Sequence, residues 1–151
     1  MDYFKADESV LELVKEIVAE NHQRLDGANI AVIMRERAQN KGGKVVFADA
    51  SLVSEKLKPL LAEKVQFVLT IADNEWPELT KAQRRALIDH ELCHCTFNDQ
   101  GKPKLRPHDM ECFAEVIERH GLWRPDQSDA KVQQAFQFEG VKVGTLRAAG
   151  E

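Results

Sequence analysis

The residues best suited to chemistry in this chain are His90, Glu91 and His94, which lie in the run His-Glu-Leu-Cys-His. On an α-helix, residues four positions apart lie on the same face, so the two imidazoles can reach one metal ion. Glu91 is rotated by about 100° from His90, which puts its carboxylate beside that ion as a proton acceptor. The spacing therefore predicts a zinc site with a general base next to it.

The residues around this run have the pattern of a helix. Thr80 and Gln83 have the spacing of a capping box, and no proline or glycine interrupts residues 80–96. One stripe at helical spacing combines apolar residues with the motif: Ala86, Leu87, His90, Glu91 and His94. We therefore expect a helix over residues 80–96 whose histidines face the interior.

A catalytic zinc ion needs a third protein ligand, which leaves its fourth position for water. A second helix is predicted over residues 108–120, ended by Gly121. Asp109 lines up with the apolar stripe of this helix and is the favoured third ligand. The alternatives are Glu111, on a more charged face, and His108, which could bind the metal or donate a hydrogen bond to a reacting oxyanion.

The rest of the chain has an α+β pattern. Residues 7–24 predict an amphipathic helix with Asp7 or Ser9 as its cap. Residues 51–61 predict a short helix in spite of Pro59. Apolar runs predict strands at residues 30–34, 44–48 and 65–73, the last being richest in β-branched residues.

We expect structural roles for the other histidines and for the cysteines. His22 is predicted to be a surface residue of the first helix, and His120 to cap the C-terminus of the second helix and interact with its dipole. Cys93 and Cys95 lie two positions apart on a predicted helix, where they cannot readily form a disulfide. Reduced thiols are therefore predicted.

Composition limits the class of protein. With 151 residues, 43% hydrophobic and 30% charged, the chain is long enough for one core, so we expect a single domain over 1–151 with a frayed tail from about residue 145. A net charge of −4 gives no positive field for nucleic acid. No apolar run reaches the roughly 20 residues of a membrane span, and no signal peptide is recognisable. These features predict a cytoplasmic protein that binds neither membranes nor nucleic acid.

The order of helix, strands, motif helix and second helix resembles the zincin metallopeptidases. More narrowly, HELCH followed by HDMECFAEVIERHGLW is similar to the putative phage metallopeptidase family, with the likeness centred on residues 65–123. The resemblance implies a zincin-like fold, with a small mixed or antiparallel sheet packed on the N-terminal and motif helices. It also implies Zn²⁺ as cofactor, a protein or peptide substrate, and the host cytosol as location. By analogy with zincins, strand 65–73 would offer an edge to an extended peptide, and a glutamate-ligated site would use Glu111.

Two functions follow from these features. The first is a zinc-dependent metallopeptidase that hydrolyses peptide bonds with Glu91 as general base. The alternative is a catalytically weak or inactive zincin-fold protein of a phage or prophage that binds or regulates a partner, because so short a chain leaves little room for a walled substrate cleft. Exchange of Glu91 for glutamine distinguishes the two, since only the first function needs that carboxylate.

Overall fold

The computed structural model describes residues 2–61, 64–108 and 113–123, which form the α+β fold that the sequence predicts. The helices are α1 (Glu8–Asn21), α2 (Lys81–His94) and α3 (Ala114–His120). The strands are β1 (Tyr3–Lys5), β2 (Ile30–Arg35), β3 (Gln39–Lys41), β4 (Lys44–Val46), β5 (Ala48–Leu52), β6 (Phe67–Ala72), β7 (Cys95–Phe97) and β8 (Pro103–Leu105). Single 3₁₀ turns lie at Gln23–Leu25, Lys58–Leu60 and Trp76–Glu78.

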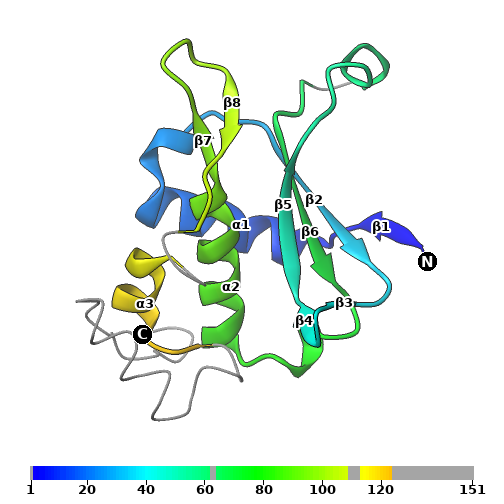
Figure 1. Ribbon diagram of the computed structural model, residues 1–151, viewed down its shortest axis with the longest axis vertical. Helices are drawn as coiled ribbons and strands as arrows, with labels where there is room; N and C mark the ends of the chain where they lie inside the picture. The colour runs from blue at the N-terminus through cyan, green and yellow to red at the C-terminus, as the bar shows by residue number, and fades with distance from the viewer. Residues whose placement is uncertain (1, 62–63, 109–112, 124–151) are drawn as a thin grey trace.

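Four strands form a mixed sheet in the order β1-β2-β6-β5 (Figure 1). β2 runs antiparallel to β1 and parallel to β6, and β5 runs antiparallel to β6. Because Phe67, Leu69 and Ile71 of β6 are fully buried, this strand forms the centre of the core. The predicted strands at 30–34 and 65–73 are therefore confirmed.

The expectation that strand 65–73 offers a free edge is wrong. β6 has a neighbour on each side, and the sheet edge beside α2 belongs to β5. The reason is that β5 contains Asp49 and Ser51 in alternation with alanines, a pattern too polar for a buried central strand. The apolar run of β6 instead marks the strand that is covered by neighbours.

Two hairpins extend from this sheet and helix framework. β3 pairs with β4 around Gly42 and Gly43, whose φ angles of 58° and 80° explain the glycines. The predicted strand 44–48 is thus divided: residues 44–46 belong to this hairpin and Ala48 begins β5. β7 pairs with β8 across a turn in which the Asn98 side chain accepts hydrogen bonds from two backbone N–H groups.

The predicted helix at residues 51–61 is wrong. Residues 51 and 52 complete β5, and only a 3₁₀ turn with Pro59 in its first turn forms near the end of the segment. Leu57, Leu60 and Leu61 are 51%, 80% and 43% exposed. Apolar residues at helical spacing did not produce a helix here because no neighbouring element buries them.

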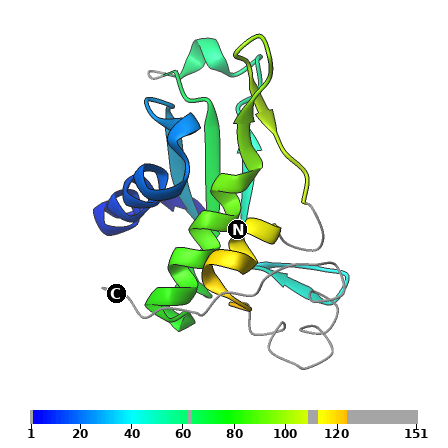
Figure 2. The same cartoon turned by 90° about the vertical axis from the view of Figure 1, so that its left-hand side faces the viewer.

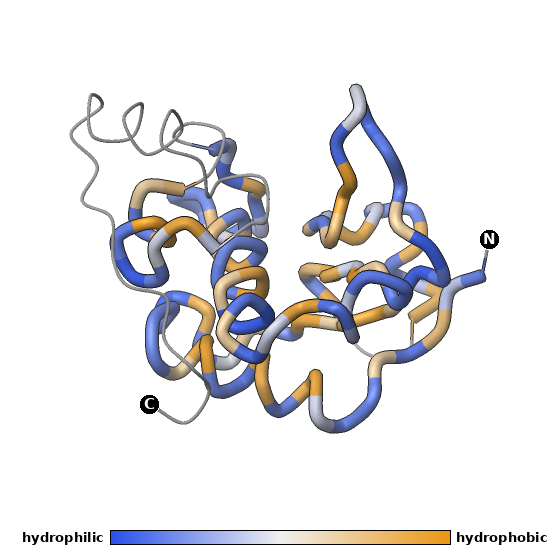
Figure 3. The backbone as a smooth tube through the Cα atoms, turned by 90° about the horizontal axis from the view of Figure 1, so that it is seen from below, coloured by the Kyte–Doolittle hydropathy of each residue, from blue (hydrophilic) through white to orange (hydrophobic). Residues whose placement is uncertain are grey.

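Helices α1 and α2 pack on the same face of the sheet (Figure 2). Asp7 caps α1 by accepting a hydrogen bond from the Val10 N–H, as one of the two expected caps. The core combines residues of α1 and α2 with inward-facing strand residues; it includes Val10, Val14, Ile17, Val32, Leu69, Ile71, Ile88 and Leu92. Hydrophobic and hydrophilic residues alternate along the described chain, as elements with one buried face require (Figure 3).

A second apolar cluster joins α2 to α3. It contains residues from both helices and from the chain on either side of α3: Leu79, Ala86, Leu87, Cys93, Phe113, Val116, Ile117 and Trp123. α2 is therefore packed between the sheet with α1 on one side and α3 on the other, which explains why its second half is buried on every face.

α3 is shorter than the helix predicted over residues 108–120. It begins at Ala114 after Phe113, which has an extended backbone, and His108 is not helical. Residues 109–112 of that prediction lie outside the described residues. Gly121 follows α3 with a φ of 75°, so the predicted end of the helix is confirmed.

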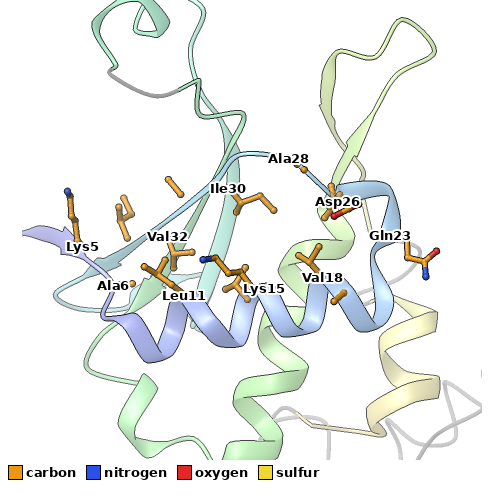
Figure 4. Close-up of a pocket in the computed structure, with 16 residues that line it drawn as sticks. Lys5, Ala6, Leu11, Lys15, Val18, Gln23, Asp26, Ala28, Ile30 and Val32 are labelled. Atoms are coloured by element: carbon orange, nitrogen blue, oxygen red, sulfur yellow. The ribbon is translucent and has the colours of Figure 1, made fainter.

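A groove of about 1120 Å³ lies between α1 and β2 (Figure 4). Leu11 and Val18 of α1 face Ile30 and Val32 across it, and Lys15 lies at its rim. The groove contains none of the motif residues, so its size alone does not make it the site of chemistry. None of the described helices has the length and apolar character needed to cross a membrane.

Candidate metal centre

Helix α2 carries the motif and begins with the predicted capping box. The Gln83 N–H donates to Thr80 Oγ1 at 3.1 Å, and the Thr80 N–H donates to Gln83 Oε1 at 2.9 Å. The helix continues to His94, so His90 and His94 lie one turn apart on one face. Their ring centroids are 5.3 Å apart.

The hairpin of β7 and β8 brings a third histidine to this pair. β7 begins directly after α2, and Cys95 pairs with Leu105 when the chain returns. The pairing continues one step further, because the Arg106 N–H donates to the His94 carbonyl at 2.6 Å. His108 follows two residues later, which places it beside the motif (the hairpin is yellow-green in Figure 1).

Ring nitrogens of His90, His94 and His108 all lie within 4.8 Å of one another. Nε2 of His90 is 3.0 Å from Nε2 of His108. Two nitrogens on one tetrahedral zinc ion, with bonds of about 2.1 Å, stand roughly 3.4 Å apart, so this separation suits a shared ion. The three imidazoles therefore fit a transition-metal ion in both donor type and spacing.

His94 is held in the form that a metal ligand needs. Its Nδ1 lies 2.7 Å from the Arg106 carbonyl oxygen, and because a carbonyl only accepts, Nδ1 carries the hydrogen and Nε2 keeps its lone pair. Burial lowers the pKa of His94; the hydrogen bond to Arg106 opposes this, and the charge of Arg106 adds to the lowering. The ring is consequently neutral at pH 7.

Phe113 forms an apolar wall behind the three histidines. Its ring centroid lies 5.3 Å from that of His90, 4.8 Å from that of His94 and 5.2 Å from that of His108. The Arg106 guanidinium stacks on the same ring at 4.6 Å. The helical pattern over residues 108–120 indicated only that Phe113 is apolar and inward, and its contacts with the motif could not be read from it.

Glu91 lies beside the histidines and is buried. Its Oε2 is 4.0 Å from Nε2 of His90, and its exposed fraction is 4%. A pocket of about 350 Å³ is lined by Glu91, the three histidines and residues 44–50 on the opposite side. A carboxylate in this position can exchange protons with a molecule bound in the pocket.

The structure brings together four of the six residues named from the sequence. His90, Glu91 and His94 meet His108, which was an alternative for the third ligand. The favoured Asp109 and the alternative Glu111 lie outside the described residues.

Asp89 is the centre of a buried polar cluster next to the motif. Its carboxylate accepts four hydrogen bonds, from Nε2 of His22 at 2.6 Å, from Nε2 of His120 at 2.7 Å and from two nitrogens of Arg119 at 3.0 and 3.1 Å. Burial raises the pKa of Asp89, but the bonds from His120 and His22 and the charge of Arg119 outweigh this and hold it far below its ordinary value. Asp89 is therefore a carboxylate at all ordinary pH values.

This cluster corrects two expectations. His22 is fully buried rather than on the surface, and His120 binds Asp89 rather than only capping α3. Asp89 itself is 0% exposed. Partners 67 and 31 residues away in the sequence satisfy it, and no local pattern indicates such pairs.

His22, Asp89 and Cys93 also lie close enough to be considered as metal ligands, but their chemistry does not fit. Arg24 donates to Nδ1 of His22 at 2.8 Å, so Nε2 carries the hydrogen that bonds Asp89. Burial, with the charge of Asp89, raises the pKa of the Cys93 thiol, which stays protonated. Cys93 and Cys95 are both free thiols, as predicted.

Comparison with protein families agrees with this geometry. The model of a family described as putative phage metallopeptidase matches residues 1–137. The chain belongs to this family. The match extends well beyond residues 65–123, on which the sequence resemblance rests, and family membership together with the histidine cluster indicates a metal-dependent peptidase. Comparison with curated proteins and with solved structures gives no match.

Proposed function

We propose that this protein is a zinc-dependent metallopeptidase in which His90, His94 and His108 hold the ion and Glu91 is the general base. The convergence of three imidazoles beside a buried carboxylate carries the proposal. Three protein ligands with a position left for water are the pattern of catalytic zinc sites. His108 is the third ligand in this assignment because its Nε2 is a metal-ligating atom that lies next to Nε2 of His90.

The proposed chemistry is hydrolysis of an amide bond. A zinc ion at this site would lower the pKa of a water molecule to about 7 and polarise the carbonyl that is attacked. Glu91 would accept a proton from a water molecule in the pocket and return it to the leaving amine nitrogen as the C–N bond breaks. The hydroxyl group would stay on the carbonyl carbon, so one water would be consumed for each bond cleaved.

The proposed substrate is an extended peptide bound along the edge of β5, an arrangement of the zincin type. β5 is one of the two outer strands of the four-stranded sheet, and Ala48 and Ala50 line the pocket that contains Glu91. An added strand would gain main-chain hydrogen bonds from this edge without requiring a particular side chain. Its backbone would then pass over the motif.

The test is metal content and peptidase activity of the full chain purified without chelator. We expect bound zinc and cleavage of an unfolded protein such as denatured casein. Glu91→Gln should keep the zinc and lose activity by about 10²- to 10⁴-fold, because only the proton transfer is removed. The matched control is Glu78→Gln, an exposed residue outside the pocket, which should change neither.

Two outcomes count against the proposal. Wild-type protein without bound metal would remove its basis, and equal activity of Glu91→Gln would remove the assigned base. If zinc is present but the biological effect of the protein survives in Glu91→Gln, the zincin-fold binding or regulatory protein becomes the better account.

A further inference from the structure

Four charged residues form a continuous chain of ion pairs behind the histidines. Arg106 Nη1 donates to Glu115 Oε1 at 2.6 Å, and Arg119 donates to Glu115 Oε2 at 3.0 and 3.1 Å. Arg119 also holds both carboxylate oxygens of Asp89. We call Arg106, Glu115, Arg119 and Asp89 the ion-pair chain.

The two ends of the ion-pair chain are adjacent to the candidate metal ligands. Asp89 precedes His90 in α2, and Arg106 contacts His94 through its own backbone at two points. The middle of the ion-pair chain lies on α3, which carries both Glu115 and Arg119. The pairs therefore join the motif helix, α3 and the loop that leads to His108.

His108 lies on an exposed part of this loop. His108 and the preceding Pro107 are exposed, in contrast to His90. Arg106 attaches this segment to α3, since its guanidinium stacks on Phe113 and pairs with Glu115. An imidazole on an exposed segment becomes a good metal ligand only when supporting groups fix its orientation.

We propose that the ion-pair chain positions His108 and His94 for metal binding, with Glu115 and Arg119 as positioning residues. The inference rests on the ligand set of the proposed function. It adds that residues too far from the ion to bind it determine how tightly the site holds the metal. Loss of such supporting interactions typically weakens metal binding by about 10- to 100-fold.

Glu115→Gln and Arg119→Gln test this with opposite changes of charge. If the residues acted only through their charge, loss of the carboxylate would weaken cation binding and loss of the guanidinium would strengthen it. If they position the ligands, both variants bind Zn²⁺ about 10-fold or more weakly than wild type. Affinity is measured with Zn²⁺ in competition with a chelator, and Co²⁺ absorption reports the ligand geometry.

Arg85→Gln is the matched control. Arg85 is also on α2 and makes two ion pairs, with Glu16 and Glu20 of α1, but none of these residues lines the histidine pocket. Arg85→Gln also removes ion pairs of α2, and it should leave Zn²⁺ affinity and the Co²⁺ spectrum unchanged. Arg119→Lys, which keeps the charge and loses the two-point contact with Asp89, should give intermediate affinity.

Three results would overturn the inference. These are wild-type affinity in both Glu115→Gln and Arg119→Gln, tighter binding in Arg119→Gln, or equally weakened binding in Arg85→Gln. Because the readout is metal binding, a protein that binds zinc in this way but cleaves no peptide would contradict the proposed function and leave the inference standing.

Discussion

Arg106 and His94 hold each other by two reciprocal bonds. The Arg106 N–H donates to the His94 carbonyl at 2.6 Å, and the His94 ring donates from Nδ1 to the Arg106 carbonyl at 2.7 Å. The first bond fixes the returning chain at the end of α2, and the second fixes the tautomer of the ring. Together these two hydrogen bonds align the loop bearing His108 and leave Nε2 of His94 available to an ion.

The first prediction concerns the third ligand. His108→Ala should weaken Zn²⁺ binding strongly, because two imidazoles remain where three are needed. Asp109→Asn should bind Zn²⁺ like wild type if His108 is the ligand, since the carboxylate is then not required. Chelator competition on both variants checks this. The reverse ranking would restore the assignment that the sequence favoured.

The second prediction concerns pH. Burial raises the pKa of Glu115, but the hydrogen bond from Arg106 and the charges of Arg119 and Arg106 lower it below its ordinary value of 4.5. The ion pairs of Glu115 therefore stabilise the fold above pH 4.5, and this stabilisation is lost as the pH falls through the lowered pKa.

Denaturant unfolding of metal-free protein at several pH values measures this effect. The free energy of unfolding of wild type should exceed that of Glu115→Gln above pH 4.5, and the difference should shrink progressively as the medium is acidified below pH 4.5. A constant difference between the two proteins across this range would contradict the prediction.

The motif, its helix and the main strands follow from the sequence because they depend on local information. The capping box of α2 needs residues three apart, and the central strand β6 is a continuous apolar run. The polar connection after α2 also contains a pattern typical of a hairpin, since Asn98 and Gly101 lie between two short strands and are typical turn residues. A hairpin predicted from this pattern would have brought His108 back to the motif.

The buried polar cluster does not follow from the sequence. The side chains of His22, Asp89 and His120 form hydrogen bonds across distant parts of the chain. Histidine and aspartate are residue types that are seldom fully buried, so the sequence gives no sign of this cluster. The leucines between residues 57 and 61 show the opposite error, because their helical spacing has no partner surface. Both cases are decided by tertiary packing rather than by local pattern.

The third prediction tests the substrate edge. The Phe47 carbonyl accepts from the Ala72 N–H, so the backbone groups alternate and the Ala50 N–H points to the outer edge of β5. Ala50→Pro removes that donor, which an edge strand tolerates. We expect kcat/KM for long peptides to fall about 10-fold or more, equivalent to roughly 1.4 kcal/mol of transition-state binding, with zinc content unchanged. Ala50→Gly keeps the N–H and is the control; equal kinetics of both variants would exclude strand addition at this position.

The fourth prediction concerns the stability contributed by Asp89. Removal of one partner from a buried ionic cluster leaves the others without compensation, so Asp89→Asn should lower the free energy of unfolding by about 3 kcal/mol. His22, His120 and Arg119 all lose part of their hydrogen bonding in this variant. The control is Asp26→Asn, on an exposed turn, which should change stability by less than about 0.5 kcal/mol. Urea unfolding of the metal-free proteins separates this effect from zinc binding, and similar stabilities of the two variants would show that the cluster contributes little to the fold.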